Sequence, residues 1–232
     1  RVEFAKRPFA LHSSEGKTVQ AQSVIIATGA TANWLGLPNE LRLAMNGGGV
    51  SACAVCDGAL PVYRNKPLAV VGGGDTAMEE TAYLTKFASK VYVIHRRDSL
   101  RASKAMQDRV LSSPKVEMVW NTRVVDVVGD ASIQSLKLEN LITREQSSLP
   151  VNGLFVAIGH SPATALLKDS GIEFDAGGYV ALKTRSSHTN IPGVFAAGDV
   201  ADSVYRQAVS AAGMGCQAAI DCERWLSEHV GH

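Results

Sequence analysis

The chain has 232 residues, of which 46% are hydrophobic and 19% are charged, and its formal net charge is +1. This length and composition predict an ordinary globular protein that buries a substantial core, as one large domain or two modest ones. The longest basic run is Arg96-Arg97, and no apolar run reaches the roughly 20 residues of a membrane-spanning helix, so the sequence disfavours nucleic acid and membrane partners.

The amino terminus, Arg1-Val2-Glu3-Phe4, resembles neither a signal peptide nor a natural start, and we expect a fragment of a longer protein. Residues 2–4 and 9–11 alternate like hairpin strands, and residues 13–17 form a polar turn. The run at 23–30 predicts a buried parallel strand that ends in small residues. These residues either admit a ligand to the backbone or only make a tight turn.

A connector with hinge potential is predicted for residues 31–50, which contain Gly47-Gly48-Gly49, and a domain boundary is expected there. Residues 50–60 then contain Cys53 and Cys56, with Asp57 beside the second thiol. The spacing suits a reversible redox pair. If Cys53 begins a helix, the unpaired backbone N–H groups there favour its thiolate. The alternative is two buried structural thiols, because cysteine is among the most buried residue types.

The four cysteines are too few for a disulfide scaffold and predict a reducing compartment, with the Cys53/Cys56 pair as the exception. Cys216 and Cys222 lie far from that pair and have no histidine pair nearby, so no metal site is expected. We interpret them as packing residues of a closing helix.

A strand, a glycine-rich turn and a helix follow the dithiol. Residues 67–71 read as a buried strand, Gly72 permits a sharp exit from it, and Gly74 lets a pyrophosphate approach the backbone. Ala77 lets the helix, expected over 78–87, pack closely on the strand. The pattern predicts a nucleotide-binding βα unit directly after the dithiol.

The next strand, 90–95, ends where such a unit carries its ribose-recognition residue. In place of an acidic residue stand His95, Arg96 and Arg97, with Arg101 a turn later. Cationic groups suit a 2'-phosphate, so the predicted cofactor is NADPH rather than NADH, and the alternative is a solvated basic turn.

Architecture rather than chemistry is expected for the antiparallel meander of residues 116–148. A helix is predicted at 99–112, antiparallel strands at 116–120, 123–128 and 133–141, a turn at 143–148, and a buried strand at 153–159. His160 follows and is interpreted as structural rather than catalytic, because nothing beside it in sequence orients it as a base.

The carboxyl-terminal part has a strand at 194–200 that ends in Gly198-Asp199. Asp199 is placed either to bind hydroxyls of a ribityl or ribose chain or only to cap a helix. The helix that begins at Arg206 carries small residues at 211–215 that can pack under a flat ligand.

Seven motifs, spread nearly from end to end of the chain, resemble those of the low-molecular-weight NADPH-dependent thioredoxin reductases of bacteria, fungi and plants. They are VIIATGA at 24–30, SACAVCDG at 51–58, GGGDTAMEE at 72–80, HRRDSLRAS at 95–103, AIGHSPAT at 157–164, GVFAAGDV at 193–200 and YRQAVSAAGMGC at 205–216. RASKAMQDR at 101–109 and RNKPL at 64–68 are most similar to plant, algal and protist members. The family's glycine-rich FAD fingerprint, on its first strand, has no counterpart before Val24.

The resemblance implies an α/β fold with two nucleotide-binding domains of the three-layer, Rossmann-like kind. A discontinuous, N-terminally truncated FAD domain would comprise residues 1–36 and 163–232, and an NADPH-binding domain with the redox pair would comprise 37–162. It also implies an enzyme that passes a hydride from NADPH to FAD, then electrons to the Cys53/Cys56 disulfide, and then exchanges disulfides with thioredoxin. Two alternatives are a flavin-deficient, NADPH-binding fragment and a related flavoprotein reductase with another acceptor.

The same resemblance assigns residues to roles. Cys53 would attack thioredoxin, Cys56 would face the flavin, and Asp57 would be the general acid or base. The cofactor contacts would be Gly72, Gly74, Asp75 and Thr76 toward the NADPH pyrophosphate, His95, Arg96, Arg97 and Arg101 toward its 2'-phosphate, and Thr28, Gly29, Asp199, Arg206, Gln207 and Ala208 toward FAD. A homodimer in the cytoplasm is expected, with plastid or mitochondrion as alternative compartments.

Overall fold

The computed structural model describes residues 1–183 and 186–230, and the chain divides into two compact units. Unit 1 comprises Arg1–Thr31 and His160–His232, and unit 2 comprises Ala32–Gly159. The sequence analysis put its boundaries at 36/37 and 162/163, and the assignment of the two units to FAD and NADPH stays a prediction. Each unit combines helices with parallel strands, and the α/β fold class is confirmed.

A five-stranded parallel sheet forms the centre of unit 2. Its strand order is β6 (Val50–Ser51), β13 (Gly153–Val156), β7 (Pro67–Val71), β8 (Lys90–Ile94) and β9 (Val116–Val119). The prediction that places β9 in an antiparallel meander is wrong, because this strand pairs in parallel with β8 and forms the sheet edge. Its alternating pattern reflects an edge position rather than an antiparallel partner.

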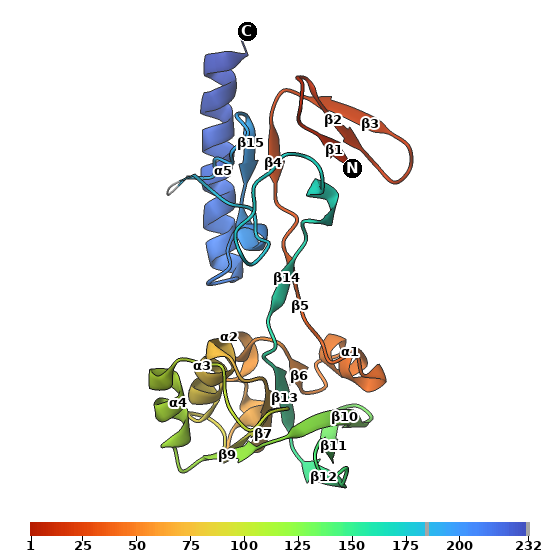
Figure 1. Ribbon diagram of the computed structural model, residues 1–232, viewed down its shortest axis with the longest axis vertical. Helices are drawn as coiled ribbons and strands as arrows, with labels where there is room; N and C mark the ends of the chain where they lie inside the picture. The colour runs from red at the N-terminus through yellow and green to blue at the C-terminus, as the bar shows by residue number, and fades with distance from the viewer. Residues whose placement is uncertain (184–185, 231–232) are drawn as a thin grey trace. The chain divides into compact units, whose positions relative to one another are not determined.

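Alternate residues of the central strands face two different cores, as a strand period of two requires. Leu68 and Val70 of β7 join the core shared with α2 (Ala54–Asp57), α3 (Asp75–Leu84) and α4 (Lys104–Leu111). Ala69 joins the core on the other face. The sheet is therefore the middle layer of three (Figure 1).

The second face of that sheet is covered by an antiparallel sheet and one helix. The strands are β10 (Thr122–Gly129), β11 (Ile133–Asn140) and β12 (Gln146–Pro150), and the helix is α1 (Pro38–Met45). Two predictions need correction here. The expected turn at 143–148 ends in strand β12, and the expected connector at 31–50 contains α1, because Leu43 is fully buried in this core.

Unit 1 contains an antiparallel sheet and a parallel pair. The antiparallel strands β1 (Val2–Glu3), β2 (Phe9–His12) and β3 (Thr18–Ala21) confirm the predicted hairpin. The parallel pair is β4 (Val24–Ile26) with β15 (Val194–Ala196). Unit 1 also contains the 3-10 helices η2 (Ala165–Leu167) and η3 (Gly198–Val200) and the long helix α5 (Ala208–His229). Strand β14 (His160–Pro162) pairs with β5 (Ala30–Ala32).

Arg7 joins the amino-terminal sheet of unit 1 to α5. Its guanidinium lies 4.8 Å from the ring centre of Phe9 and 4.5 Å from that of Trp225, and it donates to the carbonyls of Gln22 and Pro192. A cation held between two aromatic faces in this way stabilises the contact of sheet and helix.

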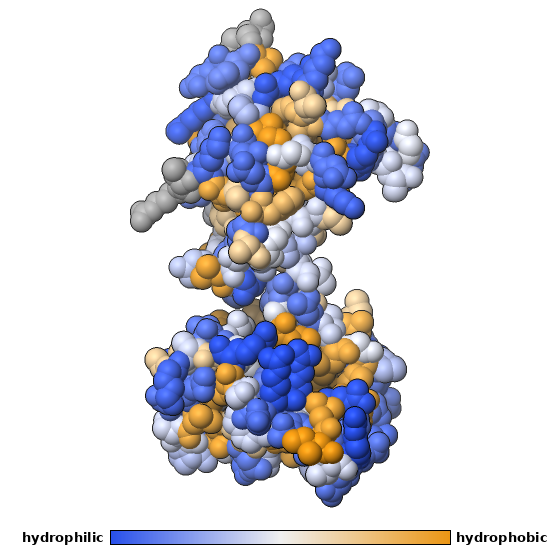
Figure 2. Space-filling view, in the orientation of Figure 1, coloured by the Kyte–Doolittle hydropathy of each residue, from blue (hydrophilic) through white to orange (hydrophobic). Residues whose placement is uncertain are grey.

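The visible surface of the molecule is largely hydrophilic, with apolar residues in scattered patches (Figure 2). In the part of the chain that the structure describes, no helix has the length and apolar character needed to span a membrane.

Glu40, in the first turn of α1, is fully buried. Its carboxylate accepts the backbone N–H groups of Leu35 and Gly36, both at 2.9 Å, and that of Leu37 at 3.3 Å. Asn39 next to it donates to the carbonyls of Val127 and Gly129. One buried charge is therefore satisfied by the loop before the helix, which fixes that loop against unit 2.

Replacement of Glu40 by alanine removes a buried carboxylate and leaves the three backbone N–H groups of residues 35–37 without this acceptor. We expect the free energy of unfolding to fall by about 3 kcal/mol in urea titrations followed by tryptophan fluorescence. The control is Glu145→Ala, because Glu145 is an exposed carboxylate of the same unit. An effect of Glu40→Ala as small as that of the control would contradict this role.

Candidate functional site

Cys53 and Cys56 form a disulfide with their Cα atoms 5.3 Å apart. Cys53 is the residue that caps α2, and the N–H of Cys56 donates to its Sγ atom at 3.2 Å. Cys53 thus stands at the start of a helix, which is the condition under which the backbone N–H groups there favour its thiolate. Cys53 is half-buried and Cys56 is exposed, so the alternative of two buried structural thiols is wrong.

Ser51 links the disulfide to the neighbouring carboxylate. Its hydroxyl donates to Asp57 Oδ2 at 2.6 Å and accepts the N–H of Cys53 at 3.0 Å. Sequence reasoning missed Ser51, and the only signal was a hydroxyl residue two positions before the first cysteine. Burial, and after it the negative charge of Asp57, raises the pKa of Tyr63. The acid chosen from the sequence is therefore held beside the redox pair by a hydrogen bond.

In the glycine turn after β7, close packing leaves no room for a side chain at two positions, and the third position faces open space. A Cβ atom on Gly72 would lie 2.4 Å from the carbonyl oxygen of Ala157, and one on Gly73 would lie 2.2 Å from the His95 ring. A Cβ atom on Gly74 would meet nothing within 4 Å. Helix α3 begins directly after it at Asp75, three residues before the predicted start, and Gly74 supplies no side-chain cap. The turn leaves space at uncapped N–H groups, where a phosphate fits.

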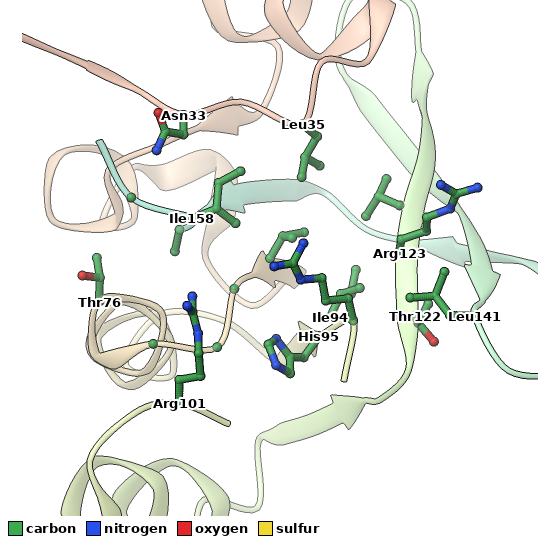
Figure 3. Close-up of a pocket in the computed structure, with 18 of the residues that line it drawn as sticks. Asn33, Leu35, Thr76, Ile94, His95, Arg101, Thr122, Arg123, Leu141 and Ile158 are labelled. Carbon is green, nitrogen blue, oxygen red and sulfur yellow. The ribbon is translucent and has the colours of Figure 1, made fainter. Parts of the chain in front are cut away.

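A pocket of about 960 Å³ opens at this turn, entirely within unit 2. Figure 3 shows Thr76 and Arg101 on one side of it and Thr122, Arg123 and Leu141 on the other. Three arginines and no carboxylate are found among the described residues that line it. The lining residues are Asn33, Leu35, Leu37, Val71, Gly72, Gly73, Gly74, Thr76, Ile94, His95, Arg96, Arg101, Thr122, Arg123, Val124, Val125, Leu141, Ala157, Ile158 and Gly159. A cavity of this size, with cationic and apolar walls, suits an anionic ligand with flat rings.

Backbone hydrogen bonds bring Arg101 to the glycine turn. The N–H groups of Arg101 and Ala102 donate to the carbonyl of Gly73 at 2.7 and 3.1 Å. Asp75 Oδ1 accepts the N–H of Ser103 at 2.8 Å and its hydroxyl at 2.9 Å. These two bonds, the backbone one first, lower the pKa of Asp75. The carboxylate of Asp75, which the sequence predicts near a pyrophosphate, thus binds Ser103 and holds the segment that carries Arg101.

The basic cluster predicted at residues 95–101 separates into three roles. Arg96 and Arg101 line the pocket, whereas Arg97 is exposed and outside the described lining. His95 is only 6% exposed, and it bonds to the backbone of Gly72 and Ser99. Burial, together with the charges of Arg97 and Arg101, lowers its pKa. His95 is therefore a neutral support beneath the turn rather than a cation at its surface.

Sequence reasoning missed Thr122, Arg123, Leu141 and Ile158 as wall residues. Three of them lie in or just after the antiparallel sheet, more than one element away from the glycine turn. Only the position of β10 beside β8 brings them to the pocket, and no local pattern indicates that contact.

In unit 1, the residues expected to hold a flavin occupy two loops and the start of α5. Thr28 donates to the carbonyl of Ala163 at 2.7 Å, and Gly29, with a φ of +74°, accepts the N–H of Ala163. Arg206 and Gln207 are half-buried and Ala208 is exposed. Asp199 has one buried carboxylate oxygen without a hydrogen-bond partner in the described structure. That unpaired acceptor fits a hydroxyl donor of a bound ligand.

Two further groups lie with these residues. Burial, and then the charge of Arg206, lowers the pKa of His160, while Asp199 acts in the opposite direction. The carboxylate of Asp202 accepts the N–H groups of Val204, Tyr205 and Arg206 between 2.8 and 2.9 Å. Burial would raise the pKa of Asp202, but these bonds outweigh it and lower the pKa. Asp202, which the sequence analysis missed, shapes the loop that presents Arg206.

Comparison with known proteins identifies the chain's relatives. Residues 1–215 match the family model described as pyridine nucleotide-disulphide oxidoreductase. The chain belongs to this family. Within the family it is 53% identical over 229 residues to a thioredoxin reductase of Dictyostelium discoideum, with 98% of this chain and 71% of that protein covered. The structure of the thioredoxin reductase from Giardia duodenalis matches with a TM-score of 0.89 at 44% identity, over 97% of this chain and 73% of that one.

The predicted resemblance to thioredoxin reductases within this pyridine nucleotide-disulphide oxidoreductase family is therefore confirmed. Thioredoxin reductase 1, mitochondrial, of Arabidopsis thaliana is also 53% identical, and the match covers 98% of this chain but 62% of that protein. The chain thus spans less than two thirds of that relative's length.

The other two cysteines were both predicted to be packing residues, and the structure confirms this for one of them. Cys222 is half-buried against Phe195 and Trp225, and its Sγ atom lies 3.1 Å from the hydroxyl of Ser23, so it is a packing residue. Cys216 is exposed, and its interpretation as a packing residue is wrong. The described residues contain no group of three or more histidine, cysteine, aspartate or glutamate side chains that could hold a metal ion.

A matched pair of substitutions separates the two kinds of glycine in the turn. Gly73→Ala forces the buried His95 ring to move and is expected to lower the free energy of unfolding by about 2 kcal/mol. Gly74→Ala enters open space in extended backbone and is expected to change it by less than about 0.5 kcal/mol. Urea unfolding of both variants measures the difference, and equal effects would contradict the packing described for His95.

Proposed function

We propose that this chain contains the redox disulfide and the NADPH site of a thioredoxin-disulfide reductase. The observation that carries the proposal is that one unit holds both a disulfide on α2 and an arginine-lined pocket at the start of α3, with α2 packed against α3. Thiol–disulfide exchange explains an accessible cysteine pair beside a carboxylic acid, and a dinucleotide explains the pocket.

NADPH is the nucleotide that the pocket residues suit. The open space at Gly74 and the Thr76 side chain would receive the pyrophosphate, and Gly72 gives the strand its close packing. Arg96 and Arg101 would bind the 2'-phosphate, with Arg97 at the outer edge. His95 and Asp75 would act indirectly, His95 by supporting the turn and Asp75 by holding the segment of Arg101.

FAD is proposed as the cofactor of unit 1, held by Thr28, Gly29, Asp199, Arg206, Gln207 and Ala208. Support comes from the unpaired buried oxygen of Asp199 and from the exposed start of α5. When bound, the flavin supplies the route by which the two electrons of a hydride from NADPH reach the disulfide. The chain's own contribution here is to bind and orient the ligand.

The redox pair itself performs the exchange with the partner. Two electrons and two protons convert the disulfide to two thiols, and Asp57, oriented by Ser51, is placed to exchange one of these protons. The thiolate of Cys53 then attacks a sulfur of oxidised thioredoxin, and the partner's S–S bond breaks as the mixed disulfide forms. Cys56 attacks Cys53 in turn, which restores the disulfide and releases reduced thioredoxin with its two thiols.

A second candidate is an NADPH-binding chain that holds flavin poorly. Unit 2 has its own five-stranded sheet, two cores and the pocket. The parallel sheet of unit 1 has two strands in the described part of the chain, and the buried residues of α5 are Ala218 and Trp225. A related reductase with another disulfide acceptor is a further alternative, and it shares all of these features.

Flavin content and thioredoxin reduction test the proposal together. We expect the chain, incubated with FAD and desalted, to retain a visible flavin band that bleaches under anaerobic NADPH, and then to reduce oxidised thioredoxin. Cys56→Ser is expected to abolish thioredoxin reduction, because the mixed disulfide is no longer resolved. Cys216→Ser is the control and is expected to retain it. NADPH binding without a flavin band would instead support the second candidate.

Arg101→Ala tests the nucleotide site alone. Loss of a charge-assisted hydrogen bond, worth about 1.5–3 kcal/mol, is expected to raise the Kd of NADPH about tenfold to a hundredfold, as measured by fluorescence titration. The Kd of NADH is expected to change less than about threefold, because NADH has no 2'-phosphate. Arg109→Ala removes an exposed arginine of α4 outside the pocket lining and is the control. Equal losses for both nucleotides would place Arg101 elsewhere in the site.

We also propose a homodimer and a cytoplasmic location, with plastid or mitochondrion as alternatives. The location is supported by the low cysteine content and by the free thiols of Cys216 and Cys222, which suit a reducing compartment. Sedimentation of the purified chain and fractionation of cells that express it would measure these two properties separately.

A further inference from the structure

Glu80, in the middle of α3, has no part in the mechanism above, and its carboxyl group lies in an unusual place. The residue is 8% exposed, and its helix packs against α2, which carries the disulfide. The side chain accepts the backbone N–H of Ala54, the residue joined to Cys53 by a peptide bond. Its Oε2 atom is buried and has no hydrogen-bond partner in the described structure.

This half-satisfied carboxyl group is bonded to the backbone of an apolar core. Ala54 is fully buried in the core that also contains Met78 and Leu84 of α3. A charge in such surroundings is weakly screened, and it acts strongly on other charges nearby. A thiolate of Cys53 would be a new negative charge on the residue next to Ala54, whose N–H group Glu80 accepts.

The charged and titratable groups around Glu80 are few. Its neighbour Glu79 is exposed and repels its negative charge, which adds to the larger effect of burial. Together, against the opposing hydrogen bond from Ala54, these effects raise the pKa of Glu80 to about 7. The elements that pack against α3 carry Asp57 and the two cysteines on α2, Lys90 and Tyr92 on β8, and Lys104, Asp108 and Arg109 on α4. Lys90 pairs with Glu117 and Lys104 pairs with Asp108, so neither cation is committed to Glu80.

We propose that Glu80 is a positioning residue of the redox centre, whose carboxyl group controls how readily the reduced Cys53/Cys56 pair forms a thiolate. When Glu80 is ionised, it opposes a second negative charge beside Ala54. When it is protonated, that opposition disappears. In the reaction, a thiol that ionises gives up one proton, the carboxylate of Glu80 can take one up, and the electron count of the exchange is unchanged.

The inference rests on the proposed function, because it assumes that the pair is reduced in the working cycle. The experiment, however, needs neither flavin nor thioredoxin. The chain is reduced, and the rate of iodoacetamide alkylation is followed from pH 5 to 9, with the peptide of Cys53 and Cys56 resolved by mass spectrometry from those of Cys216 and Cys222.

Glu80→Gln keeps an acceptor for the Ala54 N–H and removes the charge. We expect the apparent thiol pKa of the pair to fall by about half to one pH unit, which is about a threefold to tenfold faster alkylation on the rising part of the profile. Below about pH 6 the two proteins are expected to react at the same rate, because Glu80 is then protonated in the wild type. Glu79→Gln, the exposed neighbour, is the matched control and is expected to shift the profile far less.

An unchanged profile, or a rate change that is the same at every pH, would overturn the proposal, since a merely structural role has no reason to follow the protonation of Glu80. If the variant fails to fold, the wild type still gives a test. Isotope-edited infrared spectroscopy of the Glu carboxyl stretch should show Glu80 titrating at higher pH in the reduced protein than in the disulfide form, as reciprocal coupling requires. Identical titration in both forms would also refute it. Failure to reduce thioredoxin with the pH effect intact would count against the proposed function alone.

Discussion

Close backbone packing at the carboxyl edge of the parallel sheet is the constraint on which unit 2 depends. Gly72 lies against the carbonyl of Ala157, at the end of β13, and Gly73 lies against the ring of His95, at the end of β8. Three neighbouring strands therefore end at one point with no room for a side chain. Because that point is closed to the protein's own atoms on two sides, the third side at Gly74 is where a ligand can enter.

Buried carboxylates that accept backbone N–H groups fix a loop in each unit. Glu40 holds residues 35–37, of which Leu35 and Leu37 line the pocket, and Asp202 holds residues 204–206, which include Arg206. In each case the charge is stabilised by several donors at once. Glu80 differs because the N–H group of Ala54 leaves its Oε2 atom without a partner in the described structure, and burial raises the pKa of Glu80 to about 7. The same physical device thus gives rigid support at two places and a titratable group at the third.

Short sequence patterns predicted the candidate functional residues, whereas they did not predict several secondary-structure elements. The dithiol, the glycine turn and the basic residues after β8 each consist of neighbours in sequence, so local spacing reveals them. The pairing of strand β9 and the existence of helix α1 were predicted wrongly, because both elements are short and depend on the sheet and the core beside them. His95 shows the same limit: its place among arginines suggests a cation, but burial keeps it neutral.

The sequence by itself determined the family, the α/β class, the cysteine pair and the glycine-rich turn, because the motifs that indicate them each lie within about ten positions of sequence. Only the tertiary structure decided which side chains complete the site. Ser51 reaches Asp57, Arg123 reaches the pocket and Glu80 reaches the backbone beside Cys53 because separate elements pack together. Those contacts depend on burial and on the packing of one element against another, and neither produces a periodic pattern in the amino-acid sequence.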